Sequence, residues 1–157
     1  MEENQFSKYS HDSGFLHHIS NTLGDAICVV NTDIEIVYHN QEFAIMFGES
    51  DKELRGKRFG ASIGCSGHEK IVPDGICNNC KLRLSMHAAM MSGANQEKQM
   101  MVLEMETGSK EELRLIQFKS NFMEYQGEKF AVVVLNDLTR MGNETLNFIN
   151  KFYSIQK

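Results

Sequence analysis

The 157-residue sequence lacks the features expected of a disordered, membrane-spanning or nucleic-acid-binding chain. It has a single proline, Pro73, which argues against long unstructured linkers. Its longest apolar run, residues 130–135, is far shorter than the roughly 20 residues that a membrane helix requires. The net charge is −5 and the Lys and Arg residues are scattered, so no basic stripe is available to neutralise phosphates. The sequence therefore predicts one folded domain with extensions, without a membrane span and without direct nucleic-acid binding.

Signals for secretion and for common catalytic sites are also missing. Residues 1–14 are polar and acidic, whereas a secretory signal needs basic residues followed by an apolar stretch, so we expect a cytoplasmic protein. There is no Walker loop, no G-x-G-x-x-G, no G-x-S-x-G and no H-E-x-x-H motif. We therefore expect that this protein is not an enzyme.

The spacing of apolar residues predicts helices in three places. Residues 15–23 carry apolar side chains four positions apart, and Gly24 is well placed to end that helix. The stretch 80–93 shows three- and four-residue spacing and predicts a helix that ends near Gly93. A third amphipathic helix is expected at 143–155.

Residues rich in Ile and Val predict a hairpin early in the chain, and further strands follow the long helix. The hairpin lies within residues 26–40 and turns at 31–33, after which Asn40 is placed to cap a short helix. Three later strands are expected at 98–107, 112–125 and 129–138, the last two joined by a turn at Gln126 and Gly127.

Two stretches of the sequence resemble those of PAS domains. The residues "HNQEFAIMFGESDKELRGK" (39–57) are similar to the stretch that follows the second PAS strand, and "NDLTR" (136–140) is similar to the closing D-[IL]-T motif. The resemblance covers roughly residues 14–140. It implies an α+β fold, in which helices cover one face of a five-stranded antiparallel sheet, with further helices flanking the domain at both ends.

The resemblance also implies a division of the chain and a function. Residues 1–13 would form a polar tail, 14–140 the sensory domain and 141–157 a C-terminal signalling and dimerisation helix. Such a module binds a small ligand or cofactor and relays the signal to an effector, for example a histidine kinase, a cyclase or a transcription regulator. We expect a homodimer paired through the helices at 14–23 and 143–155. The sequence names neither the ligand nor the effector, and the effector is either a separate protein or part of a longer chain.

A ligand cleft would be lined by large, adaptable apolar side chains on the short helix, the long helix and the strands. The candidates are Phe43, Phe47, Met86, Met90, Met101 and Phe118. The alternative is that they are ordinary core residues. We expect Asn40 to act as a helix cap and hairpin anchor rather than as a ligand contact.

Three of the four cysteines lie within sixteen positions, which raises the alternative of a metal or redox sensor. Cys77 and Cys80 form a C-x2-C pair that brings two thiolates to one ion, and Cys65 precedes them by the spacing seen around the iron–sulfur cluster of some PAS kinases. His68 is the best candidate for a fourth ligand of zinc or a cluster. The other interpretation, three inert or loosely paired thiols, is equally compatible with the spacing.

The remaining cofactors and rival functions are less well supported. His87 lies on the helix that carries the histidine of haem-binding PAS domains, but it is nearer the C-terminal end of that helix. An ordinary, partly exposed helix residue is the favoured interpretation. Nothing resembles the cysteine motif of PAS flavin photoreceptors, and Cys28 is expected in the core. A dithiol enzyme that uses Cys77 and Cys80, and a dimerisation module with an empty cleft, are the alternatives from other functional classes.

Overall fold

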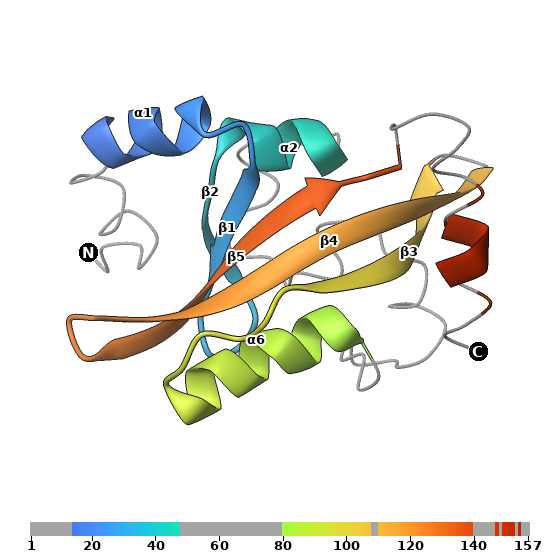
Figure 1. Cartoon of the computed structure of the whole chain (residues 1–157). Coiled ribbons are helices and arrows are strands. Elements are labelled where there is room, and N and C mark those ends of the chain that lie inside the picture. Colours follow the sequence, from blue (N-terminus) through green and yellow to red (C-terminus); the bar gives the residue numbers. More distant parts are fainter. Residues whose placement is uncertain are drawn as a thin grey trace.

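Five strands form one antiparallel sheet in the order β2-β1-β5-β4-β3, with helices packed against it (Figure 1). This computed structural model describes residues 14–47, 80–107, 110–139, 147, 149–152 and 154, the last group being helical. The strands are β1 (Ala26–Val30), β2 (Ile36–His39), β3 (Gln99–Thr107), β4 (Lys110–Tyr125) and β5 (Glu128–Asp137). The labelled helices are α1 (Gly14–Thr22), α2 (Gln41–Phe47) and α6 (Lys81–Ser92). The expected α+β class and five-stranded antiparallel sheet are confirmed.

The β1–β2 hairpin is closed by the side chain of Asn31. Its Oδ1 accepts hydrogen bonds from the backbone N–H groups of Asp33 and Glu35, both at 3.0 Å. Ile34 then adopts a left-handed conformation with φ of 60°, and a bulge interrupts the pairing between Val29 and Val30. Because an Asn side chain can mimic a backbone turn, the turn forms where the sequence predicts it.

The three later strands form an antiparallel meander, and β5 also pairs with β1. Gln126 and Gly127 make the two-residue turn between β4 and β5, with φ angles of 50° and 78°. This left-handed turn matches the natural twist of paired strands. The pairing of β1 with β5 joins the N-terminal hairpin to the meander, so β5 is the central strand of the sheet.

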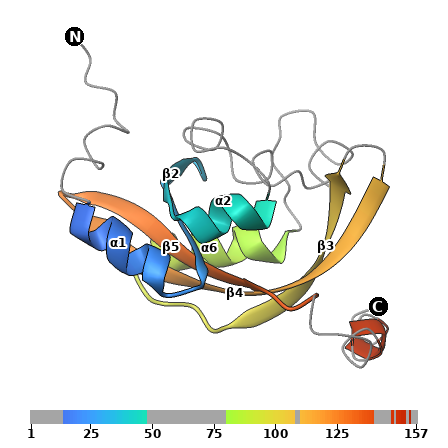
Figure 2. The ribbon, with the colours of Figure 1, turned by 90° about the horizontal axis from the view of Figure 1, so that it is seen from above.

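The main core lies on the concave face of the sheet, which α2 and α6 cover (Figure 2). Successive strand residues point to opposite faces, so alternate residues of β4, such as Ile116 and Phe118, face these helices. α6 contributes a buried stripe and ends at Gly93, whose φ of 65° and N–H bond to the Ala89 carbonyl form a left-handed cap. A smaller apolar cluster, containing Val29, Val37 and Phe130, forms on the other face.

α1 lies on the opposite side of the sheet from α2 and α6, beside β1 and β2 (Figure 2). It is attached by polar contacts, because Ser20 Oγ lies 2.7 Å and His17 Nδ1 3.0 Å from the Tyr38 hydroxyl. None of its residues is buried; Phe15 in the helix and Leu23 directly after it expose 77% and 59% of their surface. The apolar stripe expected for this helix is therefore not used in the core of its own domain. Within the described residues, no helix is long and apolar enough to cross a membrane.

Candidate functional site

The six residues expected to line a cleft come together on the concave face of the sheet. Phe43 and Phe47 of α2 pack with ring centroids 4.8 Å apart and share one core with Met86 and Met90 of α6. All six belong to or pack against one apolar group, which we call the inner-face cluster: Phe43, Phe47, Met86, Met90, Met101 and Phe118. Five are buried and Met101 is half-buried. Methionine is flexible and polarizable, so this wall is suited to repacking around an apolar molecule.

Two serines in this wall were missed by sequence reasoning. Ser85 of α6 and Ser120 of β4 are buried, and neither Oγ has a hydrogen-bond partner within the described part of the chain. The signal was available in the sequence. Ser85 falls on the helical stripe that includes Leu82 and Ala89, and Ser120 continues the strand alternation from Phe118.

Asn40 is the N-cap of α2 and joins three segments of the fold. Its Oδ1 accepts hydrogen bonds from the N–H groups of Ile27 at 2.9 Å and Phe43 at 3.0 Å. Its Nδ2 donates to the carbonyls of Ser20 at 3.0 Å and Asp25 at 2.8 Å. The side chain is fully buried and uses both donors and its acceptor oxygen on backbone groups. Asn40 therefore anchors α2 to β1 and to the end of α1.

His39, immediately before this cap, is a further buried polar residue that sequence reasoning did not single out. Its Nδ1 lies 3.1 Å from the Asn40 carbonyl oxygen, which requires the proton on Nδ1. The ring also packs against Phe43, with centroids 6.0 Å apart. His39 thus borders the inner-face cluster at the start of α2.

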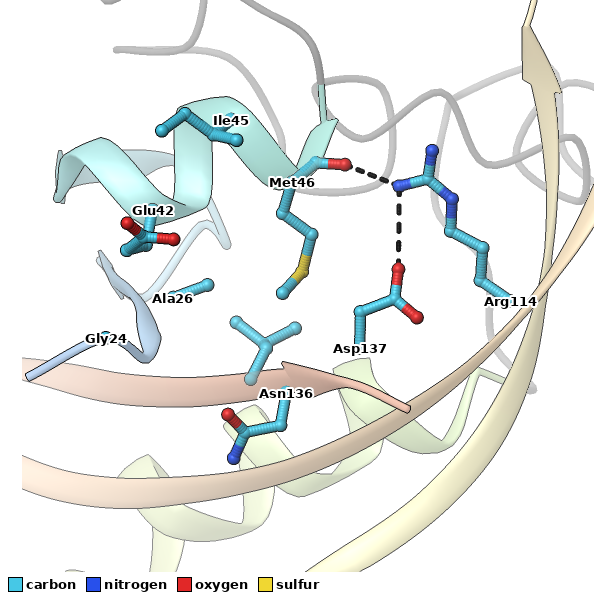
Figure 3. A pocket seen from close by; sticks show the side chains of 9 residues that line it. Gly24, Ala26, Glu42, Ile45, Met46, Arg114, Asn136 and Asp137 are labelled. Carbon is cyan, nitrogen blue, oxygen red and sulfur yellow. Dashed lines mark hydrogen bonds and ion pairs between the residues drawn. The ribbon is translucent and has the colours of Figure 1, made fainter. Parts of the chain in front are cut away.

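A pocket of about 230 Å³ opens between α2 and the ends of β4 and β5 (Figure 3). It is lined by Gly24, Ala26, Glu42, Ile45, Met46, Arg114, Leu135, Asn136 and Asp137. None of the six residues of the inner-face cluster is in this lining. However, Ala26, Met46 and Leu135 also belong to or pack against the same core, so the pocket adjoins the inner-face cluster.

Arg114 lies at one edge of this pocket and links α2 to the end of β5 (Figure 3). Its guanidinium donates a hydrogen bond to the Met46 carbonyl, in the last turn of α2. The same nitrogen lies 3.9 Å from Asp137 Oδ2 in β5, and only 13% and 17% of the two side chains are exposed. At this distance the two charges attract each other without a hydrogen bond, and their limited exposure leaves the pair less screened by salt than a surface pair.

Asp137 and Thr139, the polar residues of the "NDLTR" stretch, fix the point at which the chain leaves the sheet. Asp137 Oδ1 accepts a hydrogen bond from the Thr139 N–H at 2.9 Å. Thr139 Oγ1 in turn accepts from the Leu115 N–H at 2.8 Å, next to Arg114. A continuous set of contacts therefore runs from α2 through Arg114 to the exit of the chain.

The cysteine cluster is described only in part, since Cys65, His68 and Cys77 lie outside the described residues. Cys80 is half-buried and occupies the N-cap position of α6. Cys28 is fully buried in β1, and burial raises the pKa of its thiol far above its usual range. Among the described residues, no three His, Cys, Asp or Glu side chains form a group that could hold a metal ion. Cys28 itself lies in the core, where its raised thiol pKa favours the protonated form.

His87 is on α6 but is not one of the residues that this helix buries. Partial burial, with the nearby Arg83 guanidinium as the second cause, lowers the pKa of its imidazole. The residues that α6 places against the sheet are Leu82, Ser85, Met86, Ala89 and Met90. The arrangement thus gives no support to haem ligation by His87 at the inner-face cluster.

Comparison with protein families identifies the family to which the chain belongs. The model of the PAS fold family matches residues 20–100, about half of the sequence. The chain belongs to the PAS family. The match includes α2, the inner-face residues of α6 and the region between them, so the family assignment and the fold agree.

Solved PAS domains share the fold of this PAS domain at low sequence identity. The PAS domain of a two-component sensor histidine kinase is 14% identical with a TM-score of 0.56, covering 83% of this chain and 98% of that one. The PAS domain of nitrogen regulation protein NR(II) from Vibrio parahaemolyticus is 10% identical with a TM-score of 0.56, covering 80% and 99%. A PAS domain from Colwellia psychrerythraea is 14% identical with a TM-score of 0.57, covering 80% and 98%. No curated protein sequence matches this chain.

Proposed function

We propose that this PAS domain binds a small ligand or cofactor at the inner-face cluster and relays its presence to an effector. It acts through binding and conformational coupling and catalyses no reaction. The adaptable methionines of α6 and the aromatic residues of α2 support ligand binding. The adjoining pocket at Arg114 is the route from solvent, since its lining includes Ala26, Met46 and Leu135.

The observation that carries the relay is the position of Arg114. A ligand that displaces Phe43 or Phe47 shifts α2, and α2 is tied at Met46 to Arg114. Arg114 lies against Asp137, which holds Thr139 at the chain exit. A shift of α2 caused by the ligand would thus reach Asp137 and Thr139, where the chain leaves the sheet. These contacts connect the inner-face cluster to the chain exit without a gap, and α2 is the element whose position would change in the relay.

The effector is a partner or a fused module such as a histidine kinase, a cyclase or a transcription regulator, and the domain works in the cytoplasm as a homodimer. Two of the similar solved structures are PAS domains of a sensor histidine kinase and of a nitrogen regulation protein. They favour a two-component pathway among these effectors. The exposed apolar residues of α1 favour the dimer.

Arg114→Gln tests the relay. Loss of the guanidinium removes the contacts to Met46 and Asp137 together, so amides at both the end of α2 and the chain exit lose protection. Hydrogen exchange of the Thr139 and Leu115 amides is expected to accelerate about tenfold or more. Exchange of the amides at the end of α2 should accelerate as well. Lys129→Gln, on the exposed side of β5, serves as the control and should leave these amides unchanged. Acceleration confined to α2 would show that Arg114 does not connect the two regions.

A cysteine-based metal or redox sensor is the second candidate, favoured by the place of Cys80. An N-cap thiol lies at the positive end of the helix dipole of α6, which stabilises the thiolate that a metal or a redox reaction requires. Together with Cys77, three positions earlier in the C-x2-C pair, Cys80 would supply two of the ligands, and Cys65 and His68 would complete the set.

Protein prepared without oxygen is then expected to retain about one zinc ion, or iron with sulfide and a brown absorbance. Cys80→Ser should abolish the metal, measured by elemental analysis and visible spectroscopy. Cys28→Ser is the control and should keep it, because Cys28 is buried and protonated. Metal content should fall on acidification, since the ligands must be deprotonated. A metal-free wild-type preparation with freely titratable thiols would exclude the metal site.

A further inference from the structure

The two unpartnered hydroxyls in the inner-face wall are energetically unusual. Ser85 exposes 3% of its surface and Ser120 none, and neither Oγ has a hydrogen-bond partner in the part of the chain that the structure describes. Leaving a buried polar group unsatisfied destabilises the folded protein. Such a group in a native fold calls for an explanation.

A need for small side chains does not explain them. Ser85 lies on the buried stripe of α6, and Ala89, four residues later on the same stripe, has no exposed surface. Alanine is as small as serine, suits a helix better and carries no polar group to desolvate. The hydroxyls of Ser85 and Ser120 therefore add a cost that close packing alone does not require.

The surroundings of the two serines define what could satisfy them. Both lie on elements that contribute to the inner-face cluster, Ser85 beside Met86 and Ser120 two residues from Phe118. No Asp, Glu, Lys or Arg is among the buried residues that the structure describes. A charged ligand would be desolvated there without an opposite charge, at a large cost. A hydroxyl can both donate and accept a hydrogen bond, so either kind of polar group on a ligand would fit.

We propose that Ser85 and Ser120 are the hydrogen-bonding contacts of the ligand site, and that the ligand is a neutral, mainly apolar molecule carrying at least one oxygen or nitrogen. The apolar body packs against Met86, Met90 and Phe118, and the polar group satisfies one or both hydroxyls. This inference rests on the proposed ligand-binding function, and it names the chemical class and the two residues that recognise it.

The first test needs no ligand. Ser85→Ala and Ser120→Ala each remove an unsatisfied hydroxyl, so the midpoint of thermal unfolding is expected to stay the same or rise. Ser92→Ala is the matched control on α6, because the Ser92 hydroxyl is exposed and donates to the Ala88 carbonyl at 2.6 Å. A clearly lowered midpoint in both buried variants would show that the hydroxyls already have partners, which would overturn the proposal.

The second test uses three probes of similar size: phenol, toluene and benzoate. Phenol and toluene differ by a hydroxyl in place of a methyl group, and benzoate carries a charge. Binding is followed by amide chemical shifts in α6 and β4, in the wild type and in the Ser85→Ala/Ser120→Ala variant. The ratio of the phenol to the toluene dissociation constant is expected to rise about tenfold in the variant, because only phenol loses a hydrogen bond. Benzoate should bind most weakly to both proteins.

The outcomes separate this inference from the proposed function. If phenol and toluene bind at α6 and β4 and the ratio of their dissociation constants is the same in both proteins, the cluster is a ligand site but the serines do not hydrogen-bond the ligand. The inference then fails, while the proposed ligand-binding function stands. If benzoate binds best, the assigned ligand class is wrong. If none of the three probes binds, the inner-face cluster is not an accessible site, and the ligand-binding function falls together with the inference.

Discussion

Asn40→Ala is expected to lower the free energy of unfolding by about 3 kcal/mol, well above the ~1 kcal/mol that loss of an ordinary N-cap costs. The side chain satisfies four backbone groups, in Ile27, Phe43, Ser20 and Asp25. Alanine leaves them without a partner in a region from which water is excluded, since Asn40 is fully buried. Urea unfolding followed by circular dichroism measures the difference.

Asn31→Ala provides the control for this prediction. Asn31 also accepts two backbone hydrogen bonds, from Asp33 and Glu35, but it does so in a partly exposed turn where water can replace them. Its loss should cost about 1 kcal/mol. If Asn40→Ala costs no more than Asn31→Ala, Asn40 is not the junction of α1, β1 and α2.

The secondary structure was predictable from the sequence because each element carries a strong local signal. The β1–β2 turn follows from Asn31, the β4–β5 turn from Gln126 and Gly127, and the end of α6 from Gly93. The family resemblance supplied a single five-stranded antiparallel sheet, which local periodicity cannot provide, and the order of its strands came only from the structure. The pairing of β1 with β5 joins residues about a hundred positions apart, and no short-range pattern indicates it.

Parts of the candidate site were not predictable, because they depend on contacts between distant segments. Arg114 is one polar residue in an alternating strand, and its hydrogen bond to Met46 exists only once β4 and α2 are brought together. Ser85 and Ser120 were visible as polar residues on apolar stripes, yet whether each finds a partner is decided by the assembled fold. The inner-face residues were easier to select, since size and periodicity alone place them in the core.

α1 shows where the usual expectation for an amphipathic helix fails. An amphipathic helix usually packs its apolar face on its own domain. Here Phe15, Ile19 and Leu23 expose 77%, 41% and 59% of their surface, which leaves this face available for the pairing expected from the sequence. The helix is instead held by Ser20 and His17, through hydrogen bonds to Tyr38 and Asn40. Polar contacts thus position the helix and leave its apolar residues available to another molecule.

Charged substitutions on that face, Phe15→Glu together with Ile19→Glu, are expected to convert a homodimer into monomers. Burying a large apolar side chain contributes about 1.5–3 kcal/mol, and a two-fold interface uses each position twice. The dissociation constant of the dimer should therefore rise at least a hundredfold. Sedimentation across a range of protein concentrations measures it.

His18→Glu is the matched control on the same helix, because His18 is exposed but does not belong to the apolar face. It introduces one negative charge, against two in the double variant, at an exposed position outside the apolar face, and it should leave the dimer intact. Phe15 and Ile19 take no part in the contacts of α1 with Tyr38 and Asn40. The double variant should therefore remain folded as a monomer, with a cooperative unfolding transition. A wild-type protein that sediments as a monomer at every concentration, or a double variant that remains dimeric, would show that α1 is not the dimer interface. Its exposed apolar face would then be available to a different protein, the effector.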